Sequence, residues 1–360
     1  MIYKNIKNHS FLIRLLLVIL ILILSFSLLY LHKLKNLEPY HVTNYAMGAS
    51  IEQTVYGKNN KEAVSNAISS ISNLESKISW RIQDSDISKI NLSSGEQPVV
   101  IDETTTNILI NCLDIAKKSN GAFDPTILPI SSLWNFDDDL NQVPNNDYIK
   151  TFLQYVNFEN LEVDSEKNTA FLNNSHASID LGAAGKGAAV DAAINAYKNL
   201  EIDGGIISAG GSCIGVFGKK PTSPYWNIAI RDPIKAFENT QGEVGIISVK
   251  EGFISTSGSY EKYFEQNGKL YHHILNPKTG YPVENNLLSV TVVCNSGVLS
   301  DCLSTACFVL GPENSSDLLT QYDAYAVFID NDKNIILSNG AEKIFNLTDE
   351  QFNVLYLSND

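Results

Sequence analysis

An unbroken apolar run occupies positions 15–31, where the sequence reads LLLVILILILSFSLLYL. At a helical rise of about 1.5 Å per residue, a run of this length spans, or nearly spans, the hydrocarbon core of a membrane. Three basic residues precede the run and favour a cytoplasmic N-terminus, although two lysines on its far side weaken that argument. The run ends in Leu29-Tyr30-Leu31-His32, without the small residues of a cleavage site. We therefore predict an uncleaved signal anchor rather than a cleaved signal peptide.

This anchor divides the chain into four parts. We predict a cytoplasmic N-terminus over 1–14, one transmembrane helix over 15–31, a tether over 32–44 and a single folded domain over 45–360. The expected location is the cell membrane, with a single pass and with the folded domain on the extracytoplasmic side.

Beyond the tether, the hydrophobic pattern changes between helical and strand periods. Apolar positions at three- and four-residue steps predict helices over 60–79, 102–119, 185–200 and 300–310. Strand-like segments are 45–56, 205–214, 226–230, 245–249, 288–294, 324–329 and a pair within 161–176 that turns at Asn173-Asn174. The polar stretch 135–147 is predicted to be a surface loop. Because strands follow one another directly in the second half, the pattern predicts an α+β fold with largely antiparallel sheets flanked by helices.

Composition excludes several classes of function. A formal net charge of −14 disfavours nucleic-acid binding, since phosphate backbones would repel such a surface. The five cysteines form no CxxC pair and are odd in number, so neither a zinc site nor a disulfide framework is indicated. No G-x-G-x-x-G follows an early strand, which argues against a Rossmann dinucleotide site.

Small residues gather where a strand turns into a helix, in Ile179-Asp180-Leu181-Gly182-Ala183-Ala184-Gly185-Lys186-Gly187. Missing side chains let backbone N–H groups and a helix N-terminus approach a phosphate, and Lys186 could add a cation. The alternative is a tight strand-to-helix turn with a surface lysine, and the segment alone does not decide between them.

Asp301 and Thr305 stand four residues apart at the start of an apolar helix. Both oxygens can therefore lie on one helical face, and a carboxylate with a hydroxyl suits Mg²⁺. The competing interpretation is that Ser300 or Asp301 caps the helix while Thr305 merely packs.

Three further segments carry candidate chemistry. His272-His273 precedes an irregular loop, where a histidine can act as a base near neutral pH or simply be a satisfied hairpin residue. Phe123-Asp124 on a Pro-fixed loop could stack on and hydrogen-bond a planar ring, or form an ordinary turn. The hydroxyl-rich segment 254–260 is most simply a solvated loop.

Together, in this order along the chain, the segments resemble the ApbE family of FAD:protein FMN transferases over about 47–311. The matching stretches are Met47-Gly48, Ser85-Asp86-Ile87-Ser88 with Asn91, GAFDPTILPISSLW from Gly121, DLGAAGKGAAVD from Asp180, PYWNIAIRDP from Pro224, TSGSYEKYF from Thr256, HHILNPKTGYPV from His272 and SDCLSTACFVLG from Ser300.

The resemblance implies an ApbE-like, T-fold-like domain that binds FAD in a cleft, with its diphosphate at a Mg²⁺ ion. It implies metal ligands at Asp301, Thr305 and the carbonyl of Ala183. His273 matches the histidine of the family's H-I-x-D-P-x-T-G segment, and we predict it to be the catalytic base, with a nearby acid as the alternative. The FAD contacts that it implies are Met47, Trp80, Ala122, Phe123, Asp124, Asp180, Lys186 and Ile274. The implied reaction moves FMN from FAD to a threonine or serine hydroxyl of an acceptor protein and releases AMP. The acceptor would be a subunit of a membrane redox complex.

The chain departs from the family pattern at Asn276, where Asp is usual, at Ser212, where Asp is frequent, and at Ala49, where Thr is usual. These changes bear on rate or acceptor choice. Two other functions stay open: hydrolysis of FAD to FMN and AMP at the same site, and flavin binding without turnover by an anchored protein.

Overall fold

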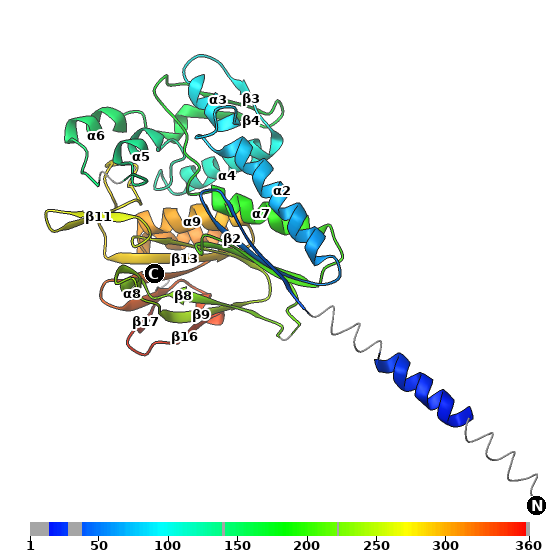
Figure 1. Ribbon diagram of the computed structural model, residues 1–360. Helices are drawn as coiled ribbons and strands as arrows, with labels where there is room; N and C mark the ends of the chain where they lie inside the picture. Colours follow the sequence, from blue (N-terminus) through cyan, green and yellow to red (C-terminus); the bar gives the residue numbers. More distant parts are fainter. Residues whose placement is uncertain (1–13, 28–37, 139–140, 222, 358–360) are drawn as a thin grey trace, which may run out of the picture.

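The computed structural model describes residues 14–27, 38–138, 141–221 and 223–357, and its folded domain is built in layers (Figure 1). A nine-stranded sheet of order β1-β2-β6-β7-β10-β13-β14-β15-β17 forms the middle layer. Neighbouring strands are antiparallel except for β15 and β17, which are parallel. The strands are β1 Tyr40–Ala46, β2 Ala49–Tyr56, β6 Gly204–Ala209, β7 Cys213–Gly218, β10 Gly252–Gly258, β13 Leu287–Cys294, β14 Tyr325–Asp330, β15 Asn334–Leu337 and β17 Asn353–Tyr356.

Helices cover one face of this sheet and a smaller sheet covers the other (Figure 1). The helices are α2 Asn60–Ile78, α4 Glu103–Lys118, α7 Gly185–Lys198 and α9 Gly297–Leu310, and the main hydrophobic core lies between them and the sheet. The smaller sheet has the order β16-β9-β8, with β16 Phe345–Leu347, β9 Glu243–Val249 and β8 Trp226–Arg231. A second core, which includes Trp226 and Val327, fills the space between the two sheets.

Shorter helices, strands and turns complete the folded domain. A third apolar cluster joins α5 Leu128–Trp134 and α6 Asn146–Leu153 to the hairpin of β11 Tyr263–Gln266 and β12 Lys269–His272. The other elements are α3 Asp86–Leu92, β3 Val99–Val100, β4 Leu161–Asp164, β5 Thr169–Leu172, α8 Pro233–Phe237, α10 Ser316–Gln321 and three short 3₁₀ turns at Phe158–Asn160, Glu313–Ser315 and Ala341–Lys343.

The predicted α+β fold with largely antiparallel sheets is confirmed, but two turns lie inside segments predicted as single strands and one predicted turn is misplaced. Segment 45–56 is the end of one strand and all of the next, because Met47 and Gly48 adopt φ of 55° and 68° and reverse the chain. Segment 205–214 likewise contains the turn between β6 and β7. The hairpin within 161–176 turns at 165–168, between β4 and β5, rather than at Asn173-Asn174. β1 begins at Tyr40, inside the segment predicted as a tether.

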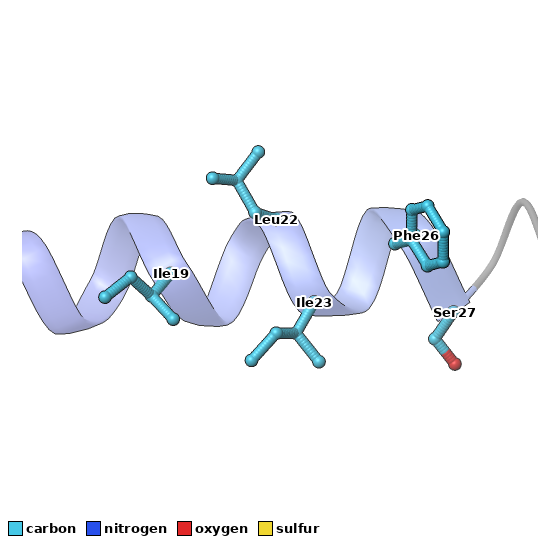
Figure 2. A pocket seen from close by; sticks show the side chains of 5 residues that line it. All are labelled: Ile19, Leu22, Ile23, Phe26 and Ser27. Atoms are coloured by element: carbon cyan, nitrogen blue, oxygen red, sulfur yellow. The ribbon is translucent and has the colours of Figure 1, made fainter.

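The predicted transmembrane segment is only partly described. Residues 14–27 form a helix whose apolar side chains, among them Ile19, Leu22 and Phe26, are exposed along it (Figure 2). Positions 28–31 of the predicted span, the N-terminal 1–13 and most of the tether lie outside the described residues. In the part of the chain that is described, no helix combines the length and the apolarity needed to cross a membrane.

Two glycines let α7 and α9 approach each other closely. A Cβ added at Gly187 would lie 2.0 Å from the carbonyl oxygen of Gly297, and one added at Gly297 would lie 2.3 Å from that of Gly187. Asp191 of α7 strengthens the contact, since its carboxylate accepts hydrogen bonds from the N–H groups of Gly297 and Val298, both at 2.9 Å. A carboxylate at a helix N-terminus is favourable. The start of α9 is therefore held against the start of α7.

We expect Gly187→Ala to destabilise the fold by about 3 kcal/mol or more, because the new methyl group overlaps the backbone of Gly297 and neither helix can move without disturbing the core. Chemical unfolding monitored by circular dichroism measures this loss. Gly182→Ala is the matched control and should cost less than about 1 kcal/mol, since its Cβ would meet only a side-chain oxygen at 3.2 Å. Equal unfolding midpoints for the two variants would contradict the proposed close approach.

Candidate functional site

The carboxylate of Asp301 meets the small-residue bend at 180–187. Its Oδ2 accepts a hydrogen bond from the N–H of Gly187 at 2.9 Å, and the residue is 5% exposed. Helix α9 begins earlier than predicted and is capped by Ser296, whose hydroxyl accepts from Leu299 N–H. The alternative in which Ser300 or Asp301 caps the helix is therefore wrong, and the structure brings Asp301 to the bend, where its side chain is buried.

The N–H of Gly187 is one of the first-turn donors of α7 that have no partner within the helix, because Ala184 is the residue that caps its start. Asp301 accepts from this N–H. No described residue donates to the carbonyl of Ala183, which precedes the helix, or to Asp301 Oδ1. Two oxygen acceptors at one bend therefore lack protein donors. Oxygen donors of this kind fit Mg²⁺, which takes few protein ligands and completes its shell with phosphate and water.

Thr305 follows Asp301 by one turn of α9 and faces strand β10. Its Oγ1 lies 3.1 Å from the hydroxyl oxygen of Ser257, which is also 2.8 Å from that of Ser304. Since a hydroxyl has one proton and two lone pairs, Thr305 can donate to Ser257 and still offer oxygen to a cation. The segment interpreted as a solvated loop is thus mostly strand, and its hydroxyl groups tie β10 to α9.

Carboxylates and histidines do not cluster at this site. Throughout the described ranges, no group of three or more His, Cys, Asp or Glu side chains could hold a metal ion. The predicted metal ligands would not form such a group, because only one of them is a carboxylate. The other two are a hydroxyl and a backbone carbonyl.

Two further turns reach the N-terminus of α7. Met47 packs on the bend, since a Cβ at Gly185 would lie 2.9 Å from Met47 Cε, and its N–H donates to Glu75 Oε1 at 2.8 Å. Lys186 lies beside the β6–β7 turn, where a Cβ at Gly210 would be 4.0 Å from its Cδ. Lys186 forms no ion pair with any described residue. Its cation is therefore available to an anion bound at the bend.

Trp80 and Asp180, two of the predicted FAD contacts, have different environments. Trp80 follows the end of α2, packs partly buried against the main core, and carries the guanidinium of Arg81 over its ring at 4.1 Å from the ring centroid. Asp180 stabilises the bend itself, since its Oδ1 accepts from Gly182 N–H at 2.8 Å and its Oδ2 from the Ser131 hydroxyl at 3.2 Å.

The predicted contacts at 122–124 are mostly buried. Ala122 and Phe123 are each 4% exposed, and Phe123 belongs to the main core. Asp124 accepts hydrogen bonds from the N–H and hydroxyl of Thr126 and from the N–H of Phe158, and burial raises the pKa of its carboxyl. In this structure the Phe123 and Asp124 side chains hold the loop rather than face a free space.

The two adjacent histidines have different environments. His272 is buried, with Nε2 3.1 Å from the carbonyl of Val283 and Nδ1 3.3 Å from the N–H of Ile274, and burial lowers its pKa to about 4. His272 is therefore a histidine whose ring nitrogens have hydrogen-bond partners beside the hairpin, which was one of the two interpretations of this segment. The ring of His273 is partly exposed, and burial, followed by the charges of His272 and Lys186, lowers its pKa to about 3. His273 is therefore neutral at physiological pH, which leaves a lone pair for proton transfer. Ile274 is 5% exposed.

Asn276, where the family pattern usually has Asp, makes the hydrogen bonds of an ordinary turn. Asn276 Oδ1 accepts from the N–H of Lys278 at 2.9 Å, and its carbonyl accepts from Thr279 and Gly280. An aspartate would make the same turn, so Asn276 removes a charge without changing the loop. Ser212, another departure from the family pattern, contacts strand β10 through its backbone: its carbonyl accepts from Thr256 N–H at 2.7 Å.

The free energy of unfolding should fall as the pH drops through the range in which histidines become protonated. His272 has a folded pKa near 4 and an unfolded pKa near 6.5, so the unfolded state binds more protons between these values and stability rises with pH there. Going from pH 7 to pH 5, the wild-type chain should lose about 2 kcal/mol more of its unfolding free energy than His272→Gln does. Urea unfolding of both chains at the two pH values measures the difference.

The raised pKa values of Asp124 and Asp191 act in the opposite direction, because the folded state retains their protons longer, but both chains share them. An identical pH dependence in wild type and His272→Gln would contradict the assignment.

Some residues at the site carry no signal that sequence reasoning could use alone. Glu75 lies within an ordinary amphipathic helix, and only the fold brings it to Met47. Asp191 ends the matching stretch that starts at Asp180, yet its partner Gly297 is more than a hundred positions away. Ser257 lies in the segment predicted to be a solvated loop, and only the fold brings its hydroxyl to Ser304 and Thr305 of α9.

The fold and the site together define a class: an α+β protein in which a small-residue helix N-terminus, a free lysine and a buried carboxylate meet, as suits a phosphate group with a divalent cation. A family model described as "ApbE family" matches residues 47–329, and the chain belongs to this family.

Similar proteins extend over most of the chain. It is 30% identical over 334 residues to the FAD:protein FMN transferase of Treponema pallidum (strain Nichols), covering 88% of this chain and 91% of that protein. It is 29% identical over 318 residues to the FAD:protein FMN transferase of Klebsiella pneumoniae (strain 342), covering 88% and 97%. The crystal structure of the ApbE protein from Thermotoga maritima superposes with a TM-score of 0.78 at 27% identity, covering 85% of this chain and 99% of that one.

Proposed function

We propose that this chain is a Mg²⁺-dependent FAD:protein FMN transferase that modifies a threonine or serine hydroxyl of another protein. Family membership and the activity named for its relatives support the class of reaction. The single structural observation that carries the proposal is the 2.9 Å hydrogen bond from Gly187 to Asp301. It joins a phosphate-binding type of bend to a buried carboxylate, and the Ala183 carbonyl and Asp301 Oδ1 beside it accept no hydrogen bond from a described residue.

The proposed metal site consists of Asp301, Thr305 and the carbonyl of Ala183. Bound there, Mg²⁺ would neutralise the pyrophosphate of FAD and make AMP a better leaving group. The helix N-terminus and Lys186 bind the same phosphates, because both present positive charge at the bend. Met47 packs on the bend and offers apolar surface to the rings of FAD. Trp80, at the turn after α2, offers its own ring. Asp180 keeps the bend in shape through its bond to Gly182.

The protein groups then carry out the transfer. The hydroxyl oxygen of the acceptor forms a new bond to the FMN phosphorus, and the bond between that phosphorus and the AMP oxygen breaks. His273 accepts the hydroxyl proton, since its imidazole is neutral at physiological pH. The products are AMP and a protein that carries FMN through a phosphoester. Most of the catalysis in such a transfer comes from positioning and charge stabilisation.

We further propose that segment 15–31 anchors the enzyme in the cell membrane with its folded domain outside the cytoplasm. The apolar run and the basic residues before it support this arrangement. An acceptor in a membrane redox complex would then lie within reach. The net charge of −14 argues against a nucleic-acid partner.

One assay tests the reaction. The full chain is incubated with FAD, Mg²⁺ and an acceptor protein that bears a threonine-containing flavinylation motif. Flavin fluorescence on the acceptor in a denaturing gel, with one AMP released per label, is the expected result. AMP and free FMN without labelling would indicate a pyrophosphatase instead, and unchanged FAD would indicate a flavin-binding protein without turnover.

A further inference from the structure

A three-residue ion cluster links separate segments next to His273. Asp137, in the loop after α5, pairs with Lys262 from the connection between β10 and β11. Its other carboxylate oxygen accepts from Arg81 at 2.5 Å, at the turn after α2. The pKa of Asp137 is well below its usual value, mainly because of the hydrogen bond from Lys262. A single carboxylate thus joins two cations from parts of the chain that are far apart in sequence.

Lys262 connects this cluster to the proposed base. Its backbone carbonyl accepts from the N–H of His273 at 3.0 Å and lies 3.3 Å from His273 Nδ1. Because a carbonyl can only accept, this contact requires the proton on Nδ1 and leaves the lone pair on Nε2. The position of the Lys262 backbone therefore determines both the orientation and the tautomer of the imidazole.

The same cluster touches a predicted FAD contact. Arg81 lies over the ring of Trp80, and its guanidinium also pairs with Asp137. The charged and titratable groups that face His273 are Lys186 from α7, Lys262 with its partner Asp137, and the neighbouring His272. Of these groups, only Asp137 carries negative charge.

We propose that Asp137 is a positioning residue for FMN transfer: by holding the Lys262 side chain it fixes the carbonyl that orients His273. This inference rests on the proposed function. The three side chains are 45% to 56% exposed, so the pairs add little to stability in water. We infer that these ion pairs act instead by holding the catalytic base in position, because a small displacement of a catalytic group strongly reduces the reaction rate.

The test compares single and double substitutions in the full chain, with transfer to the acceptor as readout. Asp137→Asn should lower kcat about 10-fold while KM for FAD changes less than about 2-fold. Asp137→Glu should recover most of the lost rate, since it restores the charge. Asp164→Asn is the matched control, because Asp164 forms a similar exposed pair with Lys167 at the β4–β5 turn, and it should transfer at the wild-type rate.

A second readout separates positioning from a general structural effect. Asp137 acts through His273, so adding Asp137→Asn to His273→Ala should cause no further loss of rate. A 10-fold further loss in that background would overturn the proposal, as would a wild-type kcat for Asp137→Asn alone. A drop in melting temperature of Asp137→Asn well beyond that of Asp164→Asn would also overturn it. Lack of transfer by the wild-type chain would instead overturn the proposed function.

Discussion

Asp301→Ala is expected to lower the rate of AMP release from FAD by about 10³-fold or more, because it removes the only carboxylate of the proposed Mg²⁺ site. A bound divalent cation contributes several kcal/mol to stabilising charge at a phosphoryl group, and each 1.4 kcal/mol corresponds to about a factor of ten in rate. Chromatographic measurement of AMP at saturating FAD and Mg²⁺ gives the rate.

The alanine variant also removes the acceptor for Gly187 N–H, so a second substitution isolates the charge. Asp301→Asn keeps an oxygen that can accept from Gly187 and should unfold close to the wild-type midpoint, yet lose activity to a similar extent. Asp317→Asn, at an exposed position of α10, is the control and should be fully active. More than about one tenth of the wild-type rate in Asp301→Asn would exclude Asp301 as a metal ligand.

His273→Ala should slow transfer to the acceptor roughly 10²–10⁴-fold, the usual contribution of a positioned general base. The imidazole is neutral at physiological pH and its Nδ1 contacts the Lys262 carbonyl, so Nε2 is free to take the hydroxyl proton. Single-turnover labelling of the acceptor, followed by flavin fluorescence, measures the chemical step. His41→Ala, which changes an exposed histidine of β1, serves as the control. A wild-type labelling rate in His273→Ala would assign the base to another group.

The sequence predicts the regular elements better than the turns between them. Helix 60–79 follows from apolar positions at three- and four-residue steps, and the observed α2 differs from it by one residue at its end. Segment 45–56 fails because its alternation continues across a hairpin, while the reversal depends on a positive φ at Met47, a residue type that does not indicate one. Segment 205–214 fails in a similar way, although Gly210 and Gly211 at its turn are typical of positive φ.

For the site, the sequence identifies the residues but not their contacts. Gly187 was interpreted as leaving room for a phosphate, whereas its missing side chain makes room for Gly297 of another helix. Phe123 has an aromatic side chain that could stack on a planar ring, yet the fold places it in the core. Asp301 could have been a cap by its position, and only the location of Ser296 and the bond to Gly187 decide otherwise. Long-range packing, which no local pattern encodes, determines these outcomes.

The central claim is that Asp301 and the adjoining bend hold a divalent cation together with FAD. Titration of the full chain with Mn²⁺, monitored by electron paramagnetic resonance with and without FAD, tests it without relying on turnover. We expect one Mn²⁺ bound tightly per chain when FAD is present, and the loss of this binding in Asp301→Asn. Equally tight Mn²⁺ binding in Asp301→Asn would contradict the account.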